Sequence, residues 1–179
     1  MFVSVDINNR SLKTKLGVLQ KKIERYGKHN IEKRENLHIT LNFLGNVSVK
    51  EEELIKSKLE NIDNKRFNII LKGLGVFPSE EFIKVIWVGC KSKGLYELEE
   101  SINDVLPKKY RSNGSFVPHV TISRLKNISK MEKNRLIEFI NGQKSKKFGT
   151  LNVTNFNLKR SDLKKDGAIH TVEKVYDLT

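Results

Sequence analysis

The chain has 179 residues, which is enough for one sizeable hydrophobic core and too few for several independent domains. Apolar residues make up 37% of it and are spread along its length, which excludes a disordered or fibrous protein. The formal net charge is +13, and a field of that sign attracts polyanions such as nucleic acid. Only eight of the 34 basic residues are arginine, so lysines that merely keep the protein soluble are the alternative explanation.

The cysteine content and the first residues bear on the compartment. Cys90 is the single cysteine, so no disulfide can form within the chain. The first residues lack the basic and long apolar segments of a secretion signal, and no stretch reaches the ~20 apolar residues of a membrane span. We therefore expect one cytoplasmic domain over residues 1–179, with no membrane as a partner.

Strand and helix alternate in the first predicted elements. Residues 2–7 alternate apolar and polar positions as a half-buried strand does, and residues 11–25 then switch to helical spacing. A second strand at residues 37–43 and a second helix at residues 49–62 repeat that order. The chain is thus predicted to begin with two β-α units.

The middle of the chain is predicted to hold an antiparallel strand pair and a helix. The two β runs are residues 67–74 and 82–90. The residues predicted to form the turn between them are Gly75, Phe77, Pro78 and Ser79. A helix is predicted at residues 95–106, where Pro107 closes it, followed by a basic loop at residues 108–114.

The last third continues the mixture of strands and helices. Residues 118–123 alternate as a strand, and residues 130–140 have helical spacing. Two further β runs, residues 151–158 and 168–178, flank a polar turn that includes residues 166–167. These elements together predict the α+β fold class.

Two of the predicted strands carry the same motif, His-x-Thr. Since side chains at positions i and i+2 project from one face of a strand, each motif gives a polar strip backed by apolar residues. The strips are His38, Thr40 and Asn42 in one strand and His119, Thr121 and Ser123 in the other. The two histidines are 81 residues apart and a helix follows each strand, so an internal duplication is our hypothesis.

A single His-x-Thr motif is weak evidence, because a partly exposed imidazole beside a β-favouring threonine is the commoner explanation of a single occurrence. Two matched settings among only four histidines are much less often a coincidence. The other two histidines, His29 and His170, lack this setting, and we expect them to be structural or exposed.

Two histidines that face one pocket can divide the work of proton transfer. Imidazole titrates near pH 6.5, so one ring can be neutral and accept a proton while the other is charged and donates one. Threonine hydroxyls beside them can donate hydrogen bonds to phosphate oxygens. Together His38, His119, Thr40 and Thr121 therefore indicate acid-base chemistry on a phosphate ester.

Other catalytic groups are not indicated by the sequence. A zinc site needs three or four ligands at short spacing, and the chain has no His-x-x-x-His, paired cysteines or adjacent carboxylates in such a pattern. A serine-nucleophile elbow and a nucleotide-binding glycine loop are also missing from the sequence. We expect no metal and no other cofactor, with water as the nucleophile.

Residues 35–45 and 116–124, which surround the two histidines, resemble the 2H phosphoesterases. The nearest branch is the RNA 2′,3′-cyclic phosphodiesterases, also called 2′-5′ RNA ligase-like proteins. The resemblance covers almost the full length of the chain. Its further signs are Phe2–Asp6, Gly75–Pro78, Trp87, and residues 158–161 followed by Gly167.

This resemblance implies a bilobal α+β fold, in which two modules related by pseudo-two-fold symmetry interleave in one domain and bring both His-x-Thr strands to a central cleft. It implies hydrolysis of RNA 2′,3′-cyclic phosphate ends to 2′-phosphomonoesters, with reversible 2′-5′ ligation in some members. It assigns His119 as the base toward water and His38 as the acid toward the departing 3′-oxygen, with Thr40 and Thr121 as phosphate ligands. RNA ends, including tRNA fragments, are the implied partner of an expected monomer.

Phe43 and Arg124 occupy corresponding positions, five residues after each histidine. The resemblance suggests that they flank the terminal nucleobase or its phosphate. Strand alternation argues against this, because an odd offset places a side chain on the face opposite the histidine unless the strand bulges. A core Phe43 and a surface Arg124 are therefore the alternatives.

Several alternatives stay open on the sequence alone. An RNA-end binding module with negligible turnover would use the same residues, and so would the same chemistry on 2′-5′ oligonucleotides, an ADP-ribose cyclic phosphate or tRNA halves. The basic stretches 108–111 and 144–147 either track an RNA backbone or are solvated loops. His170 stands where relatives often carry tyrosine, which leaves the packing near the C-terminus open.

Overall fold

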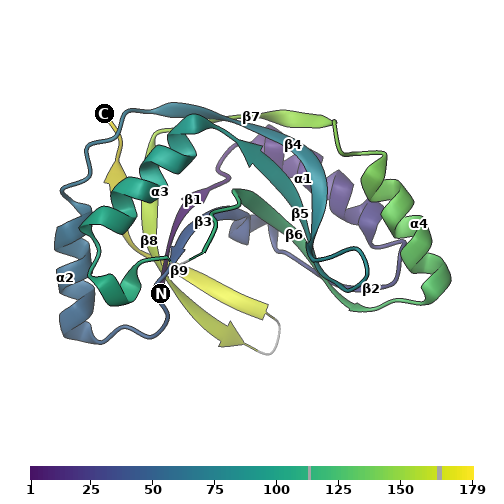
Figure 1. Ribbon diagram of the computed structural model, residues 1–179, viewed down its shortest axis with the longest axis horizontal. Coiled ribbons are helices and arrows are strands. Elements are labelled where there is room, and N and C mark those ends of the chain that lie inside the picture. Colours follow the sequence, from purple (N-terminus) through teal and green to yellow (C-terminus); the bar gives the residue numbers. More distant parts are fainter. Residues whose placement is uncertain (113, 165–166) are drawn as a thin grey trace.

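One large antiparallel sheet forms the centre of the protein, and helices pack against it (Figure 1). The computed structural model describes residues 1–112, 114–164 and 167–179. Nine strands, four α-helices and two short 3-10 helices follow one another in these residues. The α+β fold class predicted from the sequence is confirmed.

The sheet has the strand order β7-β4-β5-β6-β3-β1-β8-β9, and β2 pairs with β6 beside this path. The strands are β1 Phe2–Asp6, β2 Lys28–Ile31, β3 His38–Phe43, β4 Phe67–Pro78, β5 Ile83–Lys91, β6 His119–Asn127, β7 Lys147–Val153, β8 Asn155–Lys164 and β9 Gly167–Asp177. The junction between β6 and β3 divides the sheet into a β6 half, made of β7, β4, β5 and β6, and a β3 half, made of β3, β1, β8 and β9.

The helices begin at residues that can cap them. They are α1 Arg10–Ile23, α2 Val49–Leu59, α3 Lys93–Val105 and α4 Lys130–Asn141, with 3-10 helices at Arg34–Asn36 and Lys108–Tyr110. Asn9 accepts the Leu12 amide at 2.9 Å before α1, and Ser129 forms a capping box with Glu132 before α4. In the described ranges, no helix combines the length and apolar character that a membrane span requires.

The helices divide between the two halves of the sheet (Figure 1). α1 packs on β6 and β7 and α4 packs on β4, whereas α3 packs on β3 and β4 and touches α2. Because α1 comes directly after β1 but packs on the other half, the chain crosses between the halves early. The buried apolar side chains of both halves form one continuous cluster.

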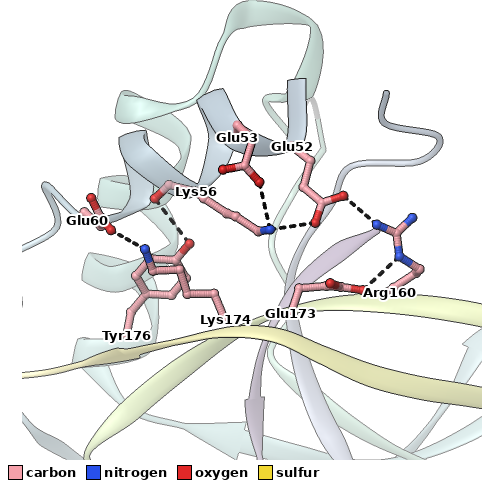
Figure 2. A network of polar contacts seen from close by, with 8 residues as sticks. All are labelled: Glu52, Glu53, Lys56, Glu60, Arg160, Glu173, Lys174 and Tyr176. Carbon is pink, nitrogen blue, oxygen red and sulfur yellow. Dashed lines mark hydrogen bonds and ion pairs between the residues drawn. The ribbon is translucent and has the colours of Figure 1, made fainter. Parts of the chain in front are cut away.

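Polar contacts fasten α2 to the hairpin of β8 and β9 (Figure 2). Glu52 of α2 is 7% exposed and pairs with Lys56 at 2.9 Å and with the Arg160 guanidinium of β8. Arg160 also pairs with Glu173 of β9 at 2.8 Å. Tyr176 of β9 donates its hydroxyl to the Lys56 carbonyl at 3.3 Å. The base of the hairpin is therefore held to a helix of its own half.

The β run predicted at residues 151–158 is wrong as a single strand. It joins the end of β7 to the start of β8, and the two strands are separated at Thr154, whose carbonyl accepts the Leu178 amide at 2.8 Å. β7 lies at the edge of the β6 half and β8 lies within the β3 half. Apolar residues continue through this crossing, so their spacing alone does not reveal the break.

The predicted turn between the two middle strands lies too early in the chain. Gly75, Phe77 and Pro78 belong to β4, and residues 79–82 make the connection to β5. A glycine is required inside β4, because a Cβ at Gly75 would lie 2.2 Å from the Trp87 ring. β2 is missing from the prediction, since its short polar sequence has no apolar alternation. Residue 113 of the predicted basic loop and residue 166 of the predicted C-terminal turn lie outside the described residues.

Candidate active site

The two His-x-Thr motifs begin neighbouring strands. β3 and β6 run antiparallel and pair through Ile39 and Val120, which are both fully buried. The residues on either side of this pair point to the opposite face of the sheet, and opposite residues in such a pair have Cβ atoms about 4.5–5.5 Å apart. By this register, these residues are His38 opposite Thr121 and Thr40 opposite His119. All four are half-buried on that one face.

Both histidines are held in the same way. The Nδ1 atom of His38 bonds to the carbonyl oxygen of Asn36 at 2.5 Å, and the Nδ1 atom of His119 bonds to that of Val117 at 2.7 Å. A carbonyl oxygen only accepts hydrogen bonds, so Nδ1 carries the proton and Nε2 of each neutral ring has a lone pair. Each imidazole is thus oriented to accept a proton at Nε2 and to return it.

A pocket opens beside these side chains. Nε2 of His38 lies 3.1 Å from Oγ1 of Thr40, which donates its proton to the ring. Thr40 and His119 both line a pocket of about 280 Å³, near the lower end of the range for small-ligand sites. The other lining residues are mostly apolar: Leu41, Phe43, Phe77, Ser115, Phe116 and Val117.

Aromatic rings enclose His38 and lower its pKa. The Phe2 ring lies 5.0 Å from the His38 ring, and the His170 ring lies 5.3 Å from it, edge-on at 81°. Burial is the main reason that the pKa of His38 falls from 6.5 to about 4. The hydrogen bond to the Asn36 carbonyl partly offsets the burial, and charge on His170 lowers the pKa further. In the free protein His38 is therefore neutral at pH 7.

His119 has a similar enclosure with a smaller effect on its pKa. The Phe77 ring lies 5.0 Å from it, edge-on at 83°, and the Trp87 ring lies 6.0 Å from it. Burial lowers the pKa of His119, the hydrogen bond to the Val117 carbonyl opposes this, and the charge of Arg124 lowers the pKa further. The larger of the two shifts belongs to His38.

A bulge in β3 turns Phe43 to the face that carries His38. Successive residues of β1 pair with Thr40 and Asn42, so Leu41 is an extra residue in β3. Beyond the bulge Phe43 pairs with Phe2, and their ring centroids are 6.4 Å apart. Phe43 is 77% exposed and lines the pocket, so the alternative of a core phenylalanine is wrong.

β6 has the same bulge at the same distance from its histidine. Successive residues of β5 pair with Thr121 and Ser123, so Ile122 is the extra residue. Arg124 then pairs with Val85, two residues along β5 from the partner of Thr121, and therefore lies on the face of the histidine. Arg124 is exposed and close enough to His119 to affect its pKa. The objection from strand alternation therefore fails for both strands.

The bulges also make one prediction wrong. Asn42 and Ser123 do not extend the polar strips, because both turn inward and are 2% and 0% exposed. Asn42 donates to the Asn103 side chain at 2.7 Å, and the Ser123 hydroxyl bonds to Nδ1 of His29 at 2.7 Å. Nε2 of His29 also bonds to the Tyr26 carbonyl, at 2.9 Å, so the prediction of a structural role for His29 is confirmed.

Sequence reasoning missed the polar residues behind His38. Asp6 pairs with His38 across β1 and β3, and it forms an ion pair of 2.5 Å with Lys159, whose side chain is only 4% exposed. Asn157 also donates to Asp6, at 3.1 Å. His170 was expected to be structural or exposed, yet its ring contacts His38. A signal was available in Lys159, a lysine that directly follows an apolar β run.

The remaining candidates lie outside this pocket. Lys109, in one predicted basic stretch, pairs with Glu51, and Lys144, in the other, pairs with Glu80 at 3.5 Å, so part of their charge is neutralised. Within the part of the chain that the structure describes, no three His, Cys, Asp or Glu side chains are grouped so that they could hold a metal ion.

Comparisons with known proteins agree with the motifs. The family model for LigT like phosphoesterase matches residues 5–87. The RNA 2′,3′-cyclic phosphodiesterase of Methanocaldococcus jannaschii is 33% identical over 97% of this chain and 98% of its own length. That of Archaeoglobus fulgidus is 31% identical over 99% of each chain. The crystal structure of TT0787 of Thermus thermophilus shares the fold, with a TM-score of 0.82 and 23% identity over 98% of this chain and 96% of that one. The chain therefore belongs to the LigT-like 2H phosphoesterases, in the family of RNA 2′,3′-cyclic phosphodiesterases.

Proposed function

We propose that this protein hydrolyses the 2′,3′-cyclic phosphate ends of RNA to 2′-phosphomonoesters, with His38 and His119 as a metal-independent acid-base pair. The observation that carries the proposal is the matched hydrogen bond from each Nδ1 to a carbonyl, which leaves Nε2 of each ring, on neighbouring strands, as the atom that can take up a proton. Nε2 of His38 accepts the Thr40 hydroxyl in the free protein. Both relatives are named RNA 2′,3′-cyclic phosphodiesterase, which supports the substrate. The net charge of +13 also suits an RNA substrate.

We infer a bilobal arrangement of one interleaved domain. Apart from β2, the sheet has four strands on each side of the β6-β3 junction; α1 and α4 lie toward the β6 half, and α2 and α3 lie toward the β3 half (Figure 1). Both central strands start with His-x-Thr and bulge three residues after the histidine, as expected for two modules related by a pseudo-two-fold axis. A cleft over the junction would then offer both motifs to one phosphate. We expect the domain to act as a cytoplasmic monomer on RNA ends such as tRNA fragments.

Four residues on the same face of the sheet as the histidines fit the parts of such a substrate. The hydroxyls of Thr40 and Thr121 can donate hydrogen bonds to the two non-bridging phosphate oxygens. Arg124 adds a guanidinium that matches a phosphate or carboxylate with two parallel hydrogen bonds. Phe43 offers an exposed ring on which the terminal base can stack.

Hydrolysis requires one proton to be removed and one to be delivered. Nε2 of the base takes a proton from water as the water oxygen bonds to phosphorus. The bond between phosphorus and O3′ breaks, and Nε2 of the acid gives its proton to O3′. The products are a 2′-phosphomonoester and a free 3′-hydroxyl. If a ribose 5′-hydroxyl replaces water, the same steps give the 2′-5′ ligation.

The roles of the two histidines depend on their protonation. The family resemblance makes His119 the base and His38 the acid, and the acid must carry a proton. Since the pKa of His38 is about 4 in the free protein, this ring is neutral at pH 7. A phosphate anion bound beside it favours the charged imidazole. We therefore infer that His38 takes up its proton together with the substrate.

The test is a turnover assay on an oligoribonucleotide that ends in a 2′,3′-cyclic phosphate, followed by phosphorus NMR. We expect the signal of a 2′-phosphomonoester to grow, at a rate that EDTA does not change. Substitution of either His38 or His119 with alanine should slow the reaction by about 10²-fold or more while leaving the thermal unfolding temperature nearly unchanged. Full activity in either variant would refute the mechanism. Tight binding without turnover by the unaltered protein would favour an RNA-end binding module instead.

A further inference from the structure

The two histidines differ in one respect that the motifs do not explain. Each has one ring packed edge-on against it and one tilted ring beside it. The edge-on ring at His119 is Phe77, which cannot ionise, and the edge-on ring at His38 is His170, which can. The two surroundings therefore share an arrangement of one edge-on ring and one tilted ring, but they differ in charge once His170 takes up a proton.

We propose that His170 is a positioning residue for the reaction proposed above, one that holds the His38 ring in place and makes its protonation differ from that of His119. The inference rests on the proposed function only for its catalytic consequence. The contact itself belongs to the free protein, where the two ring centroids lie 5.3 Å apart.

His170 is fixed on both sides of its contact with His38. Its ring also lies edge-on against Phe2, at 5.0 Å and 77°, so Phe2, His38 and His170 form a cluster of three rings. Two residues earlier in β9, the Ala168 carbonyl accepts the Asn36 side chain at 2.9 Å. Asn36 is the residue whose own carbonyl holds Nδ1 of His38. β9 therefore supports His38 through a ring contact and through the backbone that orients it.

The part of β9 after His170 is held in place by ion pairs. Three residues beyond His170, Glu173 pairs with Arg160 of β8, and Arg160 pairs with Glu52 of α2 (Figure 2). The network holds the strand against a helix of the same half. A ring carried by such a strand can restrict the orientation of the His38 imidazole better than a ring carried by a loop.

Two other ionisable groups face the pair, and they are of opposite charge. Asp6 of β1 lies opposite His38, and Lys159 of β8 forms an ion pair with Asp6 at 2.5 Å. Their effects on the pKa of His38 have opposite signs, and so do their effects on the pKa of His170. Burial lowers the pKa of His170 itself. When His170 does carry a proton, its charge lowers the pKa of His38, so protonation of one imidazole disfavours protonation of the other.

Nδ1 of His170 is buried and has no hydrogen-bond partner among the described residues. A buried polar atom without a partner costs free energy, and the apolar ring of phenylalanine would avoid that cost. An imidazole at this position is therefore less favourable for the stability of the fold than an apolar ring. Such a cost is expected if the imidazole has a role in the active site.

The experiment is a titration of the histidine rings by NMR, in the unaltered protein and in His170→Phe, which keeps a ring and removes the charge. We expect the pKa of His38 to rise in the variant, because charge on His170 lowers it, while the pKa of His119 stays unchanged. The mirror variant Phe77→His is the matched control: it should lower the pKa of His119 and leave that of His38 in place. His170→Gln provides a second neutral variant in case the first does not fold.

The pH dependence of kcat/KM gives the catalytic readout. The limb that belongs to His38 should move to higher pH in His170→Phe, in the same direction as the NMR value. An unchanged or lower pKa of His38 in both neutral variants would overturn the inference. The NMR titration needs no turnover, so the inference can stand if the unaltered protein proves inactive, and that inactivity would count against the proposed function alone.

Discussion

The β3 and β6 strands carry the same local design in different surroundings. In both, a carbonyl two residues earlier holds Nδ1 of the histidine, and a bulge three residues later turns a side chain back to the same face. Around His38 the neighbours include the ion pair of Asp6 with the buried Lys159 and a third imidazole. Around His119 they are Phe77, Trp87 and an exposed arginine. Backbone geometry thus sets where each ring points, and the packed side chains set when it carries a proton.

The largest effect is expected from removal of either imidazole, and it can show whether the two rings differ in role. His38→Ala and His119→Ala should each slow hydrolysis of the cyclic phosphate by about 10²–10⁴-fold. A p-nitrophenyl phosphodiester has a leaving group that needs no acid. If His38 is the acid, His38→Ala should keep most of its activity on that ester, whereas His119→Ala should lose it. The reverse pattern would exchange the two roles.

The threonines give a second comparison between the strands. Thr40→Val and Thr121→Val should each lower kcat by about 10²-fold, since each removes one donor to a phosphate oxygen. Thr40 also donates to Nε2 of His38 at 3.1 Å, so only Thr40→Val should change the pKa of that ring. Steady-state kinetics and a histidine titration of both variants measure this. Equal effects on His38 would mean that the bond to Thr40 is unimportant in solution.

The next largest effect is expected at Phe43, the residue that follows the bulge in β3 and that we propose stacks on the terminal base. Phe43→Ala should weaken binding of a terminal nucleotide by about 1–3 kcal/mol, because it removes a stacking platform. The effect should appear in KM for oligonucleotides and be largest for purine ends. Phe43→Tyr keeps the ring and is the matched control. An unchanged KM in Phe43→Ala would mean that Phe43 is an exposed apolar residue that does not bind the terminal base.

The smallest effect is expected from Arg124, through the pKa of His119. Burial is the main cause of the lowered pKa of His119, and Arg124 adds to it. Arg124→Gln should therefore raise the pKa of His119 and leave that of His38 unchanged. The limb of the pH profile of kcat/KM that belongs to His119 should move to higher pH by the same amount, because kcat/KM reports on the free protein. A shift at His38 instead would show that the two halves are coupled through the junction.

Periodicity in the sequence was enough to predict the four α-helices, most of the strands and the two motifs. It located His38, Thr40, His119 and Thr121 because alternation in a short strand is a local property. The bulges could not be predicted from the sequence. An extra residue such as Leu41 is recognised only from the register of pairing with the neighbouring strand. The break at Thr154 was hidden by apolar residues on both sides.

The contact between His38 and His170 could not be predicted for a different reason. It joins residues far apart in the sequence, and it depends on the order in which β3, β1, β8 and β9 lie in the sheet. Nothing in the residues around His170 indicates that order. The family resemblance pointed to this position only as a departure from tyrosine, without a physical reason.

The single paired position at the junction has a consequence for regiochemistry. An antiparallel pair centred on Ile39 and Val120 has a local two-fold axis, and a phosphodiester has nearly the same symmetry about its phosphorus atom. A site with only this symmetry would bind the cyclic phosphate of the substrate in either orientation. It would then break the bond from phosphorus to O2′ as readily as the bond to O3′. Selection of one isomer must therefore come from the residues that break the equivalence, and the ratio of 2′- to 3′-phosphate released measures their influence directly.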